Sequence, residues 1–288
     1  MTQPVIWLDG AWKTKETATI SVYDHGLLYG DGIFEGLRIY AGRVFRLEDH
    51  LKRLYNSAQY LRIAMPLKSE ELADWVQQAV ARWGQQTGYI RLLVTRGIGA
   101  LGLDPQKCEK PAVIIIVDEI QLYPPEMYQT GIPIITASVR RTPRSSSEAR
   151  VKSLNYLNNI LAKMEAREAG CLEALMLNTE GLVAECTADN IFLVHQNKLF
   201  TPAAVHGALE GITRKVVLEC AEALAIPYEE AALAPYDVYT AEEVFMTGSG
   251  AEIMPITKVD GRTIGNGKPG PVTEQLRAAF QEVALQSS

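Results

Sequence analysis

The sequence predicts a two-domain protein of the α+β class, and three observations support this. The chain has 288 residues, enough for one large or two medium domains. Segments with strand and helix periodicity alternate in both halves. Between the halves, Pro124 and Pro125 interrupt the pattern, because neither continues a strand or a helix interior. We therefore expect a small first domain over 1–119, a linker over 120–131 and a larger second domain over 132–288.

The first half should contain strands and two amphipathic helices. Strands are expected at 5–8, in a hairpin of 37–40 with 44–46, and at 89–96 and 112–118. The last of these is continuously apolar and β-branched, which predicts burial on both faces. Apolar residues at helical spacing predict helices over 47–63 and 70–83.

The second half repeats this alternation. Strands are expected at 132–138, 173–177, 182–185, 191–195, 198–200, 243–247 and 253–259. One helix is marked by the apolar spacing of Leu157, Ile160, Leu161 and Met164, and it should end near Gly170. Two more helices are expected, one from about 211 and one over 272–283.

Composition excludes several function classes. The net charge of −6 and the lack of a basic stripe argue against a nucleic-acid partner. The longest apolar run, 112–117, is far too short to span a bilayer, and the first residues do not resemble a signal peptide. We therefore expect no membrane partner and a cytoplasmic protein. The cysteines are widely spaced and predict reduced thiols rather than disulfides or a metal site: Cys108, Cys171, Cys186 and Cys220.

Two glycine-containing stretches are candidates for binding a phosphate. One is 211–214 at an expected helix start, where unpaired N–H groups suit an anion. The other is 247–251, a turn between two strands in which glycines allow backbone N–H groups to approach an anion. Taken alone, a simple helix cap and a tight turn explain these stretches better.

A lysine and an acid are the other candidates. Lys152 stands just before an expected helix, and a lysine becomes a nucleophile when burial or nearby positive charge destabilises its ammonium form. Its residue type alone equally fits a surface charge. Glu185 ends an expected strand and precedes small polar residues, so it is either a positioned carboxylate or a solvent-exposed residue beside a turn.

Three motifs together resemble the class IV aminotransferases, the fold type IV enzymes that use pyridoxal phosphate (PLP). Residues 185–192, 199–201 and 209–214 match the family's gapped signature in residue type and spacing. Residues 24–38 match its N-terminal motif, and 152–159 match the segment around its cofactor-binding lysine. Within the family, the chain is most similar to branched-chain amino-acid aminotransferases. The resemblance implies a small α/β domain and a larger pseudo-barrel domain, as in D-amino-acid aminotransferase.

The resemblance implies specific roles for the cofactor-binding residues. Lys152 would form the Schiff base with PLP and carry the Cα proton of the substrate. Glu185 would pair with the pyridine nitrogen and keep it protonated, and Tyr156 would hydrogen-bond the phenolic oxygen. Arg53 would bind the phosphate, for which its fixed charge and forked donors are suited. Further phosphate contacts are implied for Gly211, Ile212, Thr213 and Ser249.

The resemblance also implies a substrate pocket. Tyr89 and the backbone at Gly250 and Ala251 would hold the α-carboxylate, and Arg91 would receive the side-chain carboxylate of glutamate or 2-oxoglutarate. Without the family, Tyr89 and Arg91 fit simple alternation on a half-exposed strand. The wall for aliphatic side chains would comprise Tyr29, Phe34, Gly36 and Arg38, with the glycine-containing loop 97–104 nearby.

We therefore expect transamination between L-leucine, L-isoleucine or L-valine and 2-oxoglutarate by a homodimer or higher homo-oligomer. A D-amino-acid aminotransferase and an aminodeoxychorismate lyase of the same fold are alternatives. A phosphate-binding protein without enzymatic activity is an alternative from another class. Activity assays with L- and D-amino acids, and a test of whether the purified protein has the yellow colour of lysine-bound PLP, would separate these possibilities.

Overall fold

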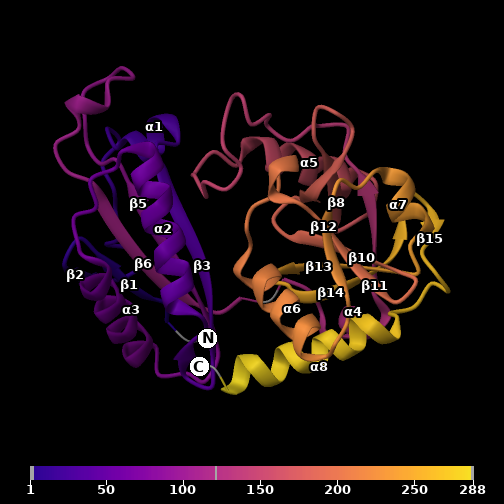
Figure 1. Ribbon diagram of the computed structural model, residues 1–288. Coiled ribbons are helices and arrows are strands. Elements are labelled where there is room, and N and C mark those ends of the chain that lie inside the picture. Colours follow the sequence, from indigo (N-terminus) through magenta and orange to yellow (C-terminus); the bar gives the residue numbers. More distant parts are fainter. Residues whose placement is uncertain (1–2, 121, 287–288) are drawn as a thin grey trace. The chain divides into compact units, whose positions relative to one another are not determined.

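The computed structural model describes residues 3–120 and 122–286, which form two compact units (Figure 1). The first unit comprises 3–120, Val151–Asn155 and 284–286. The second comprises 122–150 and Tyr156–Val283. The expected division did not include the transfer of Val151–Asn155 to the first unit, and the expected linker contains a helix, Pro125–Thr130. The expected boundaries at 119 and 131 stay a prediction.

The first unit is built on a six-stranded antiparallel sheet with the strand order β2-β1-β6-β5-β3-β4. Its central strands, β3, β5 and β6, carry β-branched and leucine side chains that favour strands. Its strands are β1 (Val5–Leu8), β2 (Ala11–Lys13), β3 (Gly32–Tyr40), β4 (Arg43–Val44), β5 (Gly88–Thr95) and β6 (Ala112–Asp118).

Strand β6 corrects one expectation. Its side chains alternate between half-buried and buried, so only one face is fully covered, although the run is apolar throughout Ala112 to Val117. The covered face bears Val113, Ile115 and Val117, each 1% exposed or less. In an antiparallel sheet one face often remains partly open, and the sequence run alone does not reveal this.

Two amphipathic helices cover the buried face of this sheet. Helix α2 (Leu47–Leu61) packs on β3, and helix α3 (Ser69–Trp83) packs on β6 and β1. Leu51, Leu54, Leu72 and Val76 recur at helical spacing and lie in one core with the strands. The expected helices over 47–63 and 70–83 are therefore present. A short helix, α1 (His25–Tyr29), precedes β3.

The second unit is built on a curled nine-stranded sheet with both parallel and antiparallel neighbours. Along the order β12-β11-β10-β13-β14-β7-β8-β9, the far strand β9 comes back close to β10 and β11, which agrees with the pseudo-barrel domain that was expected. The strands are β7 (Ile132–Thr136), β8 (Glu173–Leu177), β9 (Val183–Cys186), β10 (Asn190–His195), β11 (Lys198–Pro202), β12 (Tyr228–Ala231), β13 (Glu243–Gly248), β14 (Glu252–Val259) and β15 (Arg262–Thr263), which pairs with β14.

Three helices of the second unit begin close to where the sequence predicts: α5 (Leu157–Glu168), α6 (Ile212–Ala223) and α8 (Pro271–Gln286), whose last residues group with the first unit. The short helices α4 (Pro125–Thr130) and α7 (Pro235–Thr240) were not predicted. Single 3-10 turns occur at Pro105–Lys107 in the first unit and Ala204–His206 in the second.

Helix α5 buries a different face from the one its apolar residues indicate. Asn159, Ala162 and Ala166 face the core, and they are 7% exposed or less. The large apolar residues that marked the helix in the sequence lie on its exposed side: Leu157, Ile160, Leu161 and Met164, which are 44–68% exposed. Small residues allow the helix to approach β8 closely, so the bulky ones remain outside.

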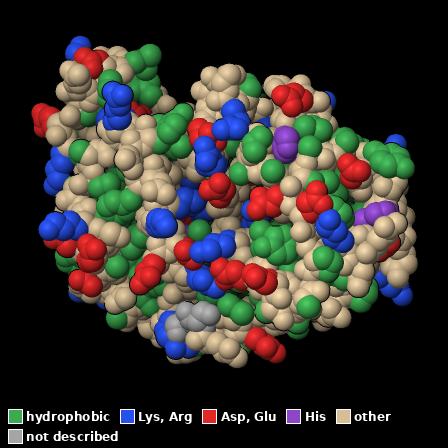
Figure 2. Space-filling model, viewed as in Figure 1, with side chains coloured by type: hydrophobic (Ala, Val, Ile, Leu, Met, Phe, Trp, Pro, Cys, Tyr) green, Lys and Arg blue, Asp and Glu red, His purple; other side chains and the backbone are tan. Residues whose placement is uncertain are grey.

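The surface and interior give no sign of several other site types. Figure 2 shows acidic and basic side chains interspersed on the face in view, in keeping with a net charge of only −6. Among the described residues, no helix combines the length and apolar character needed to cross a bilayer. Residues 3–120 and 122–286 also contain no cluster of His, Cys, Asp and Glu suited to a metal ion.

Candidate active site

In the first unit, the backbone around Lys152 is attached to strand β3. The Lys152 carbonyl accepts a hydrogen bond from Phe34 N at 3.0 Å, and Leu154 N donates to Gly32 O at 2.9 Å. Ser153 forms an antiparallel bridge with Ile33. The segment Val151–Asn155 thus occupies the edge of β3 beside Gly32 to Phe34, and this fixes the position from which the Lys152 side chain extends.

The Lys152 ammonium lies 4.6 Å from the centroid of the Phe34 ring. The Arg91 guanidinium lies 4.6 Å from the same ring and 5.4 Å from the Tyr89 ring. An aromatic face attracts a cation at this distance. Phe34 is 8% exposed, so one buried ring brings together the candidate nucleophile and the candidate carboxylate-binding arginine.

Five of the expected substrate residues share one face of the first sheet. Phe34, Gly36 and Arg38 alternate along β3 and so point to the same side. Arg91 pairs with Gly36 and Tyr89 pairs with Arg38 in the β3–β5 register, which places them on that side too. A Cβ on Gly36 would stand 2.0 Å from the Tyr89 hydroxyl, so any larger residue at this position would displace that hydroxyl.

Arg53 lies on α2 against a buried acid that the sequence interpretation did not single out. Its Nε and Nη2 donate to the two carboxylate oxygens of Glu35, both at 2.7 Å, and His50 Nδ1 lies 2.7 Å from Glu35 Oε2. Glu35 is on β3 and is 0% exposed. An acid in the middle of an apolar strand was the signal that could have identified it.

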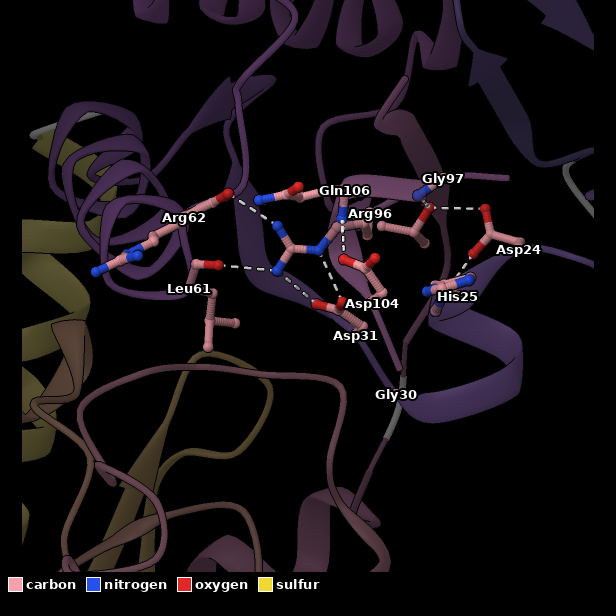
Figure 3. Close-up of polar contacts among 12 residues, drawn as sticks. Asp24, His25, Gly30, Asp31, Leu61, Arg62, Arg96, Gly97, Asp104 and Gln106 are labelled. Atoms are coloured by element: carbon pink, nitrogen blue, oxygen red, sulfur yellow. Dashed lines mark hydrogen bonds and ion pairs between the residues drawn. The ribbon is translucent and has the colours of Figure 1, made fainter. Parts of the chain in front are cut away.

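The N-terminal motif 24–38 is anchored by hydrogen bonds rather than by apolar contacts alone (Figure 3). Arg96 donates to both oxygens of Asp31, at 2.7 and 3.0 Å, and to the carbonyls of Leu61 and Arg62 at 2.8 Å. It therefore satisfies the carbonyls at the end of α2. Tyr29 lies on α1, and its hydroxyl accepts from Gly102 N at 2.9 Å. The motif thus connects α1, α2 and the loop 97–104.

In the second unit, Glu185 is buried on β9, so it is not the solvent-exposed turn residue that its local sequence also allowed. It is 5% exposed. Its Oε1 lies 2.8 Å from Arg141 Nη2, and its Oε2 accepts from Asn190 Nδ2 at 3.1 Å and from Leu209 N at 2.9 Å. Charge-assisted bonds of this kind hold a carboxylate in a fixed place. Neither Arg141 nor Asn190 was identified from the sequence as a partner.

The start of helix α6 lies next to this carboxylate network. Asn190 donates to Leu209 O at 2.8 Å, and its Oδ1 would be 2.0 Å from a Cβ on Gly211. Gly211 is the N-cap residue and has no side chain to accept the first helical N–H groups. Ile212 and Thr213 follow and are buried. This helix start fits a phosphate, because its N–H groups and dipole favour an anion.

The turn between β13 and β14 carries the remaining expected residues. Ser249 and Gly250 are half-buried, and Ala251 is fully buried. Just before them, Thr247 is 1% exposed and lies opposite Asn190 in the β10–β13 register. Its Oγ1 has no hydrogen-bond partner within the described part of the chain, so this hydroxyl is suited to a polar ligand.

Each unit therefore carries groups that suit a phosphorylated aldehyde cofactor. The first holds an amine beside an aromatic ring and a positioned guanidinium. The second holds a buried carboxylate, an uncapped helix start and an unpaired hydroxyl. Tyr156, the N-cap residue of α5, is half-buried and follows directly after the Lys152 segment in the chain.

Comparisons with known proteins agree with this chemistry. The family described as amino-transferase class IV matches residues 32–259. A Methanocaldococcus jannaschii protein, named only provisionally as a branched-chain-amino-acid aminotransferase, is 46% identical over 278 residues, which cover 96% of each chain. The D-alanine aminotransferase of Bacillus licheniformis is 35% identical over 287 residues, which cover 97% of each.

A solved structure extends the likeness to the whole fold. The crystal structure of the T.th. branched-chain amino acid aminotransferase with pyridoxamine 5'-phosphate has a TM-score of 0.95 and 37% identity to this chain, and the match covers 100% of this chain and 96% of that one. The expected family, fold and cofactor are thereby confirmed. The chain belongs to the class IV aminotransferases and is a PLP-dependent transaminase of fold type IV.

Proposed function

We propose that the enzyme transfers amino groups between L-leucine, L-isoleucine or L-valine and 2-oxoglutarate, giving branched-chain 2-oxo acids and L-glutamate. The observation that carries this is the shared face of β3 and β5, where the buried Phe34 ring lies against the Arg91 guanidinium. An aromatic wall suits an aliphatic side chain, and a guanidinium suits the second carboxylate of glutamate. One pocket with both features accepts both kinds of substrate.

The residues proposed to hold the cofactor are found in each of the two units. Bound PLP supplies a ring that stabilises negative charge at the substrate Cα. Lys152 would take the proton from the substrate Cα as a base and give it up as an acid at the aldehyde carbon of the cofactor, since an amine can reach both carbons. Glu185 holds the pyridine nitrogen protonated. The other residues proposed to hold the cofactor are Arg53, Tyr156, Gly211, Ile212, Thr213 and Ser249.

The proposed substrate site uses the face already described and the turn after β13. Arg91 binds the distal carboxylate, while Tyr89 and the backbone of Gly250 and Ala251 bind the α-carboxylate. The wall around the aliphatic side chain consists of Tyr29, Phe34, Gly36 and Arg38. The role of Tyr29 is proposed from its place in the N-terminal motif. Its hydroxyl accepts a hydrogen bond from Gly102 N.

The two half-reactions test the substrate assignment separately. In each half-reaction, the enzyme with bound PLP is mixed with one amino acid, and the absorbance of the cofactor is followed as it is converted to its amino form. We expect Arg91→Met to slow the half-reaction with L-glutamate by about 100-fold, the loss of one charge-assisted pair. The half-reaction with L-leucine should change by less than about fivefold. Equal losses with both substrates would contradict the role of Arg91 as the distal carboxylate site.

A D-amino-acid aminotransferase is the second candidate, and the 35% identity to the Bacillus licheniformis D-alanine aminotransferase favours it. A panel of L- and D-amino acids with 2-oxoglutarate decides between them. Turnover with L-leucine and none with D-alanine supports the branched-chain proposal. The reverse preference would replace it with the D-specific function.

Lys152 is tested by substitution and by chemical attachment. Borohydride reduction of the yellow protein should leave the cofactor covalently bound at Lys152, as peptide mass spectrometry would detect. Lys152→Ala should abolish transamination without lowering the thermal unfolding temperature of the cofactor-free protein. Near-normal turnover in this variant would overturn the assignment. Lys52→Ala is a matched control, because that lysine is exposed on α2.

We also propose a cytoplasmic homodimer. The exposed apolar side of α5, formed by Leu157, Ile160, Leu161 and Met164, supports self-association, since monomers seldom expose contiguous large apolar groups. The four cysteines are all free thiols, which suits a reducing compartment. Sedimentation of the wild type and of Ile160→Lys tests the first point, and the variant should dissociate.

A further inference from the structure

Glu35 is a fully buried acid on strand β3. It lies between Phe34 and Gly36 on β3, so its side chain points to the opposite face of the sheet from theirs, which is the face that α2 covers. It is 0% exposed. A buried carboxylate is costly unless charged or hydrogen-bonded partners surround it. The partners of Glu35 therefore explain why an acid is placed there.

Two side chains of helix α2 hold Glu35. Arg53 makes a two-bond fork through Nε and Nη2, both at 2.7 Å, and His50 lies one turn earlier with Nδ1 at 2.7 Å. Residues three apart lie on the same helix face, so both reach the same carboxylate. Three short contacts at two oxygens leave Glu35 little freedom to rotate.

The protonation states follow from the surroundings. Burial acts to raise the pKa of Glu35, but the Arg53 charge and the hydrogen bonds from Arg53 and His50 outweigh it and hold this pKa far below its usual value. Burial lowers the pKa of His50 despite the attraction of Glu35. At neutral pH the acid is thus ionised and the imidazole neutral, so Nδ1 carries the proton and donates a hydrogen bond to the carboxylate.

The geometry also relates this group to Lys152. Ser57 follows Arg53 by one turn of α2, and its Oγ lies 3.4 Å from Lys152 N. The Lys152 charge is close enough to act on the pKa of His50. Arg53 therefore stands beside the segment that carries the cofactor-binding lysine. The fork engages the Nε–Nη2 edge of the guanidinium.

We propose that Glu35 is a positioning residue for cofactor binding: it holds Arg53 by one edge so that the guanidinium meets the PLP phosphate in a fixed orientation, and His50 fixes Glu35 in turn. This inference rests on the proposed role of Arg53 as a phosphate ligand. An arginine loses much side-chain entropy when it is immobilised. Here that loss occurs on folding, so it does not weaken phosphate binding.

A purely electrostatic role predicts the opposite sign. If Glu35 only neutralised Arg53, removal of its charge would strengthen the attraction between Arg53 and phosphate. If Glu35 positions Arg53, its removal weakens phosphate binding even though the local charge becomes more positive. The direction of the change in PLP affinity therefore separates the two roles.

The test titrates cofactor-free, full-length protein with PLP and with pyridoxal, which lacks the phosphate, and follows absorbance and near-UV circular dichroism. We expect Glu35→Gln to weaken PLP binding by about tenfold, the scale for ordering one long side chain. Pyridoxal binding should not change. Glu48→Gln is the matched control, since Glu48 is an exposed acid on α2 that loses the same charge. It should alter neither affinity.

Several outcomes would overturn the inference. PLP affinity that is unchanged or higher in Glu35→Gln refutes positioning, and equal losses for PLP and pyridoxal indicate general damage to the site. If the wild-type protein binds PLP and pyridoxal equally tightly, the proposed contact between Arg53 and the phosphate is refuted. A wild type that binds neither refutes the proposed function, so the two failures are distinguishable.

A second pair of variants keeps the proposal testable if Glu35→Gln does not fold. His50→Asn retains a donor in place of Nδ1, whereas His50→Leu removes it. We expect the preference for PLP over pyridoxal to survive in His50→Asn and to fall several-fold in His50→Leu. Equal preferences in the two variants would contradict a role for His50 in fixing Glu35. Thermal unfolding of the cofactor-free proteins confirms that each variant is folded.

Discussion

Gly36→Ala is the most specific perturbation of the face of β3 and β5 that is proposed to bind the substrate. The added Cβ would stand 2.0 Å from the Tyr89 hydroxyl, whereas ordinary contact begins at 3.4 Å. The hydroxyl must therefore move by about 1.4 Å, the difference between these two distances. The backbone of Gly36 is not in the left-handed region, so alanine fits the strand itself and the tyrosine takes up the change.

The displacement of the Tyr89 hydroxyl allows an estimate of the loss in kcat/KM. A shift of about 1 Å in a substrate-positioning group can cost about 100-fold in rate, or about 2.7 kcal/mol. We expect kcat/KM for L-leucine to fall by about that factor if Tyr89 holds the α-carboxylate. The free energy of unfolding should change by less than about 2 kcal/mol, because the crowding is partly offset by the preference of a strand for alanine over glycine.

A double-mutant cycle with Tyr89→Phe tests whether Gly36→Ala lowers kcat/KM by displacing the Tyr89 hydroxyl. Without the hydroxyl, the nearest ring atom to the new Cβ is Cζ at 2.8 Å, so a smaller shift suffices. Gly36→Ala should then cost about tenfold or less in the Tyr89→Phe background. The two substitutions should be coupled by at least about 1.4 kcal/mol, as measured from kcat/KM with L-leucine.

Two results would refute this reasoning. Additive losses would mean that Gly36 does not act through Tyr89. Wild-type kcat/KM in Gly36→Ala would mean that the position of Tyr89 does not matter for the substrate. Urea denaturation of all four proteins checks that a loss of activity is not a loss of fold.

Three further predictions concern stability. Arg141→Met leaves the buried Glu185 without its cation and should lower the free energy of unfolding in urea by about 3 kcal/mol. Glu243→Ala removes the buried acceptor at the start of α8 and should cost about 2 kcal/mol in the same assay. The pKa values of Glu35 and His50 are both lowered on folding, so below about pH 6.5 the unfolded chain binds more protons than the folded one. The free energy of unfolding, measured in urea, should therefore fall as the pH decreases from 7 to 4. It should fall less steeply in His50→Leu, which lacks the imidazole.

The amphipathic helices of the first unit were predictable because the apolar residues that recur at helical spacing are also the residues that are buried. Leu51, Leu54 and Ala58 recur at helical spacing and all lie in the core of that unit. The same rule located α5 but not its buried face. Large apolar side chains predict that a helix exists, yet alanines at Ala162 and Ala166 make the close contact with the sheet.

Much of the candidate site was predictable by motif, and its supporting residues were not. Lys152 and Glu185 lie in recognisable segments. Their partners come from distant parts of the chain: Glu185 is held by Arg141 and by the backbone at Leu209. Such pairings depend on the path of the chain in space, and residue spacing carries no information about them. Glu35 is the exception, because a charged residue within an apolar strand predicts a buried partner.

The return of Val151–Asn155 to strand β3 bears on how the polypeptide is made. When a ribosome has completed the first 120 residues, the β3 edge beside Gly32 to Phe34 still lacks its neighbour, and Lys152 has not been synthesised. An unpaired edge of this kind invites pairing with other chains. A nascent first unit should therefore depend on chaperones until the later segment emerges. By the same logic, a gene cut at the linker would separate the lysine from the strand that orients it.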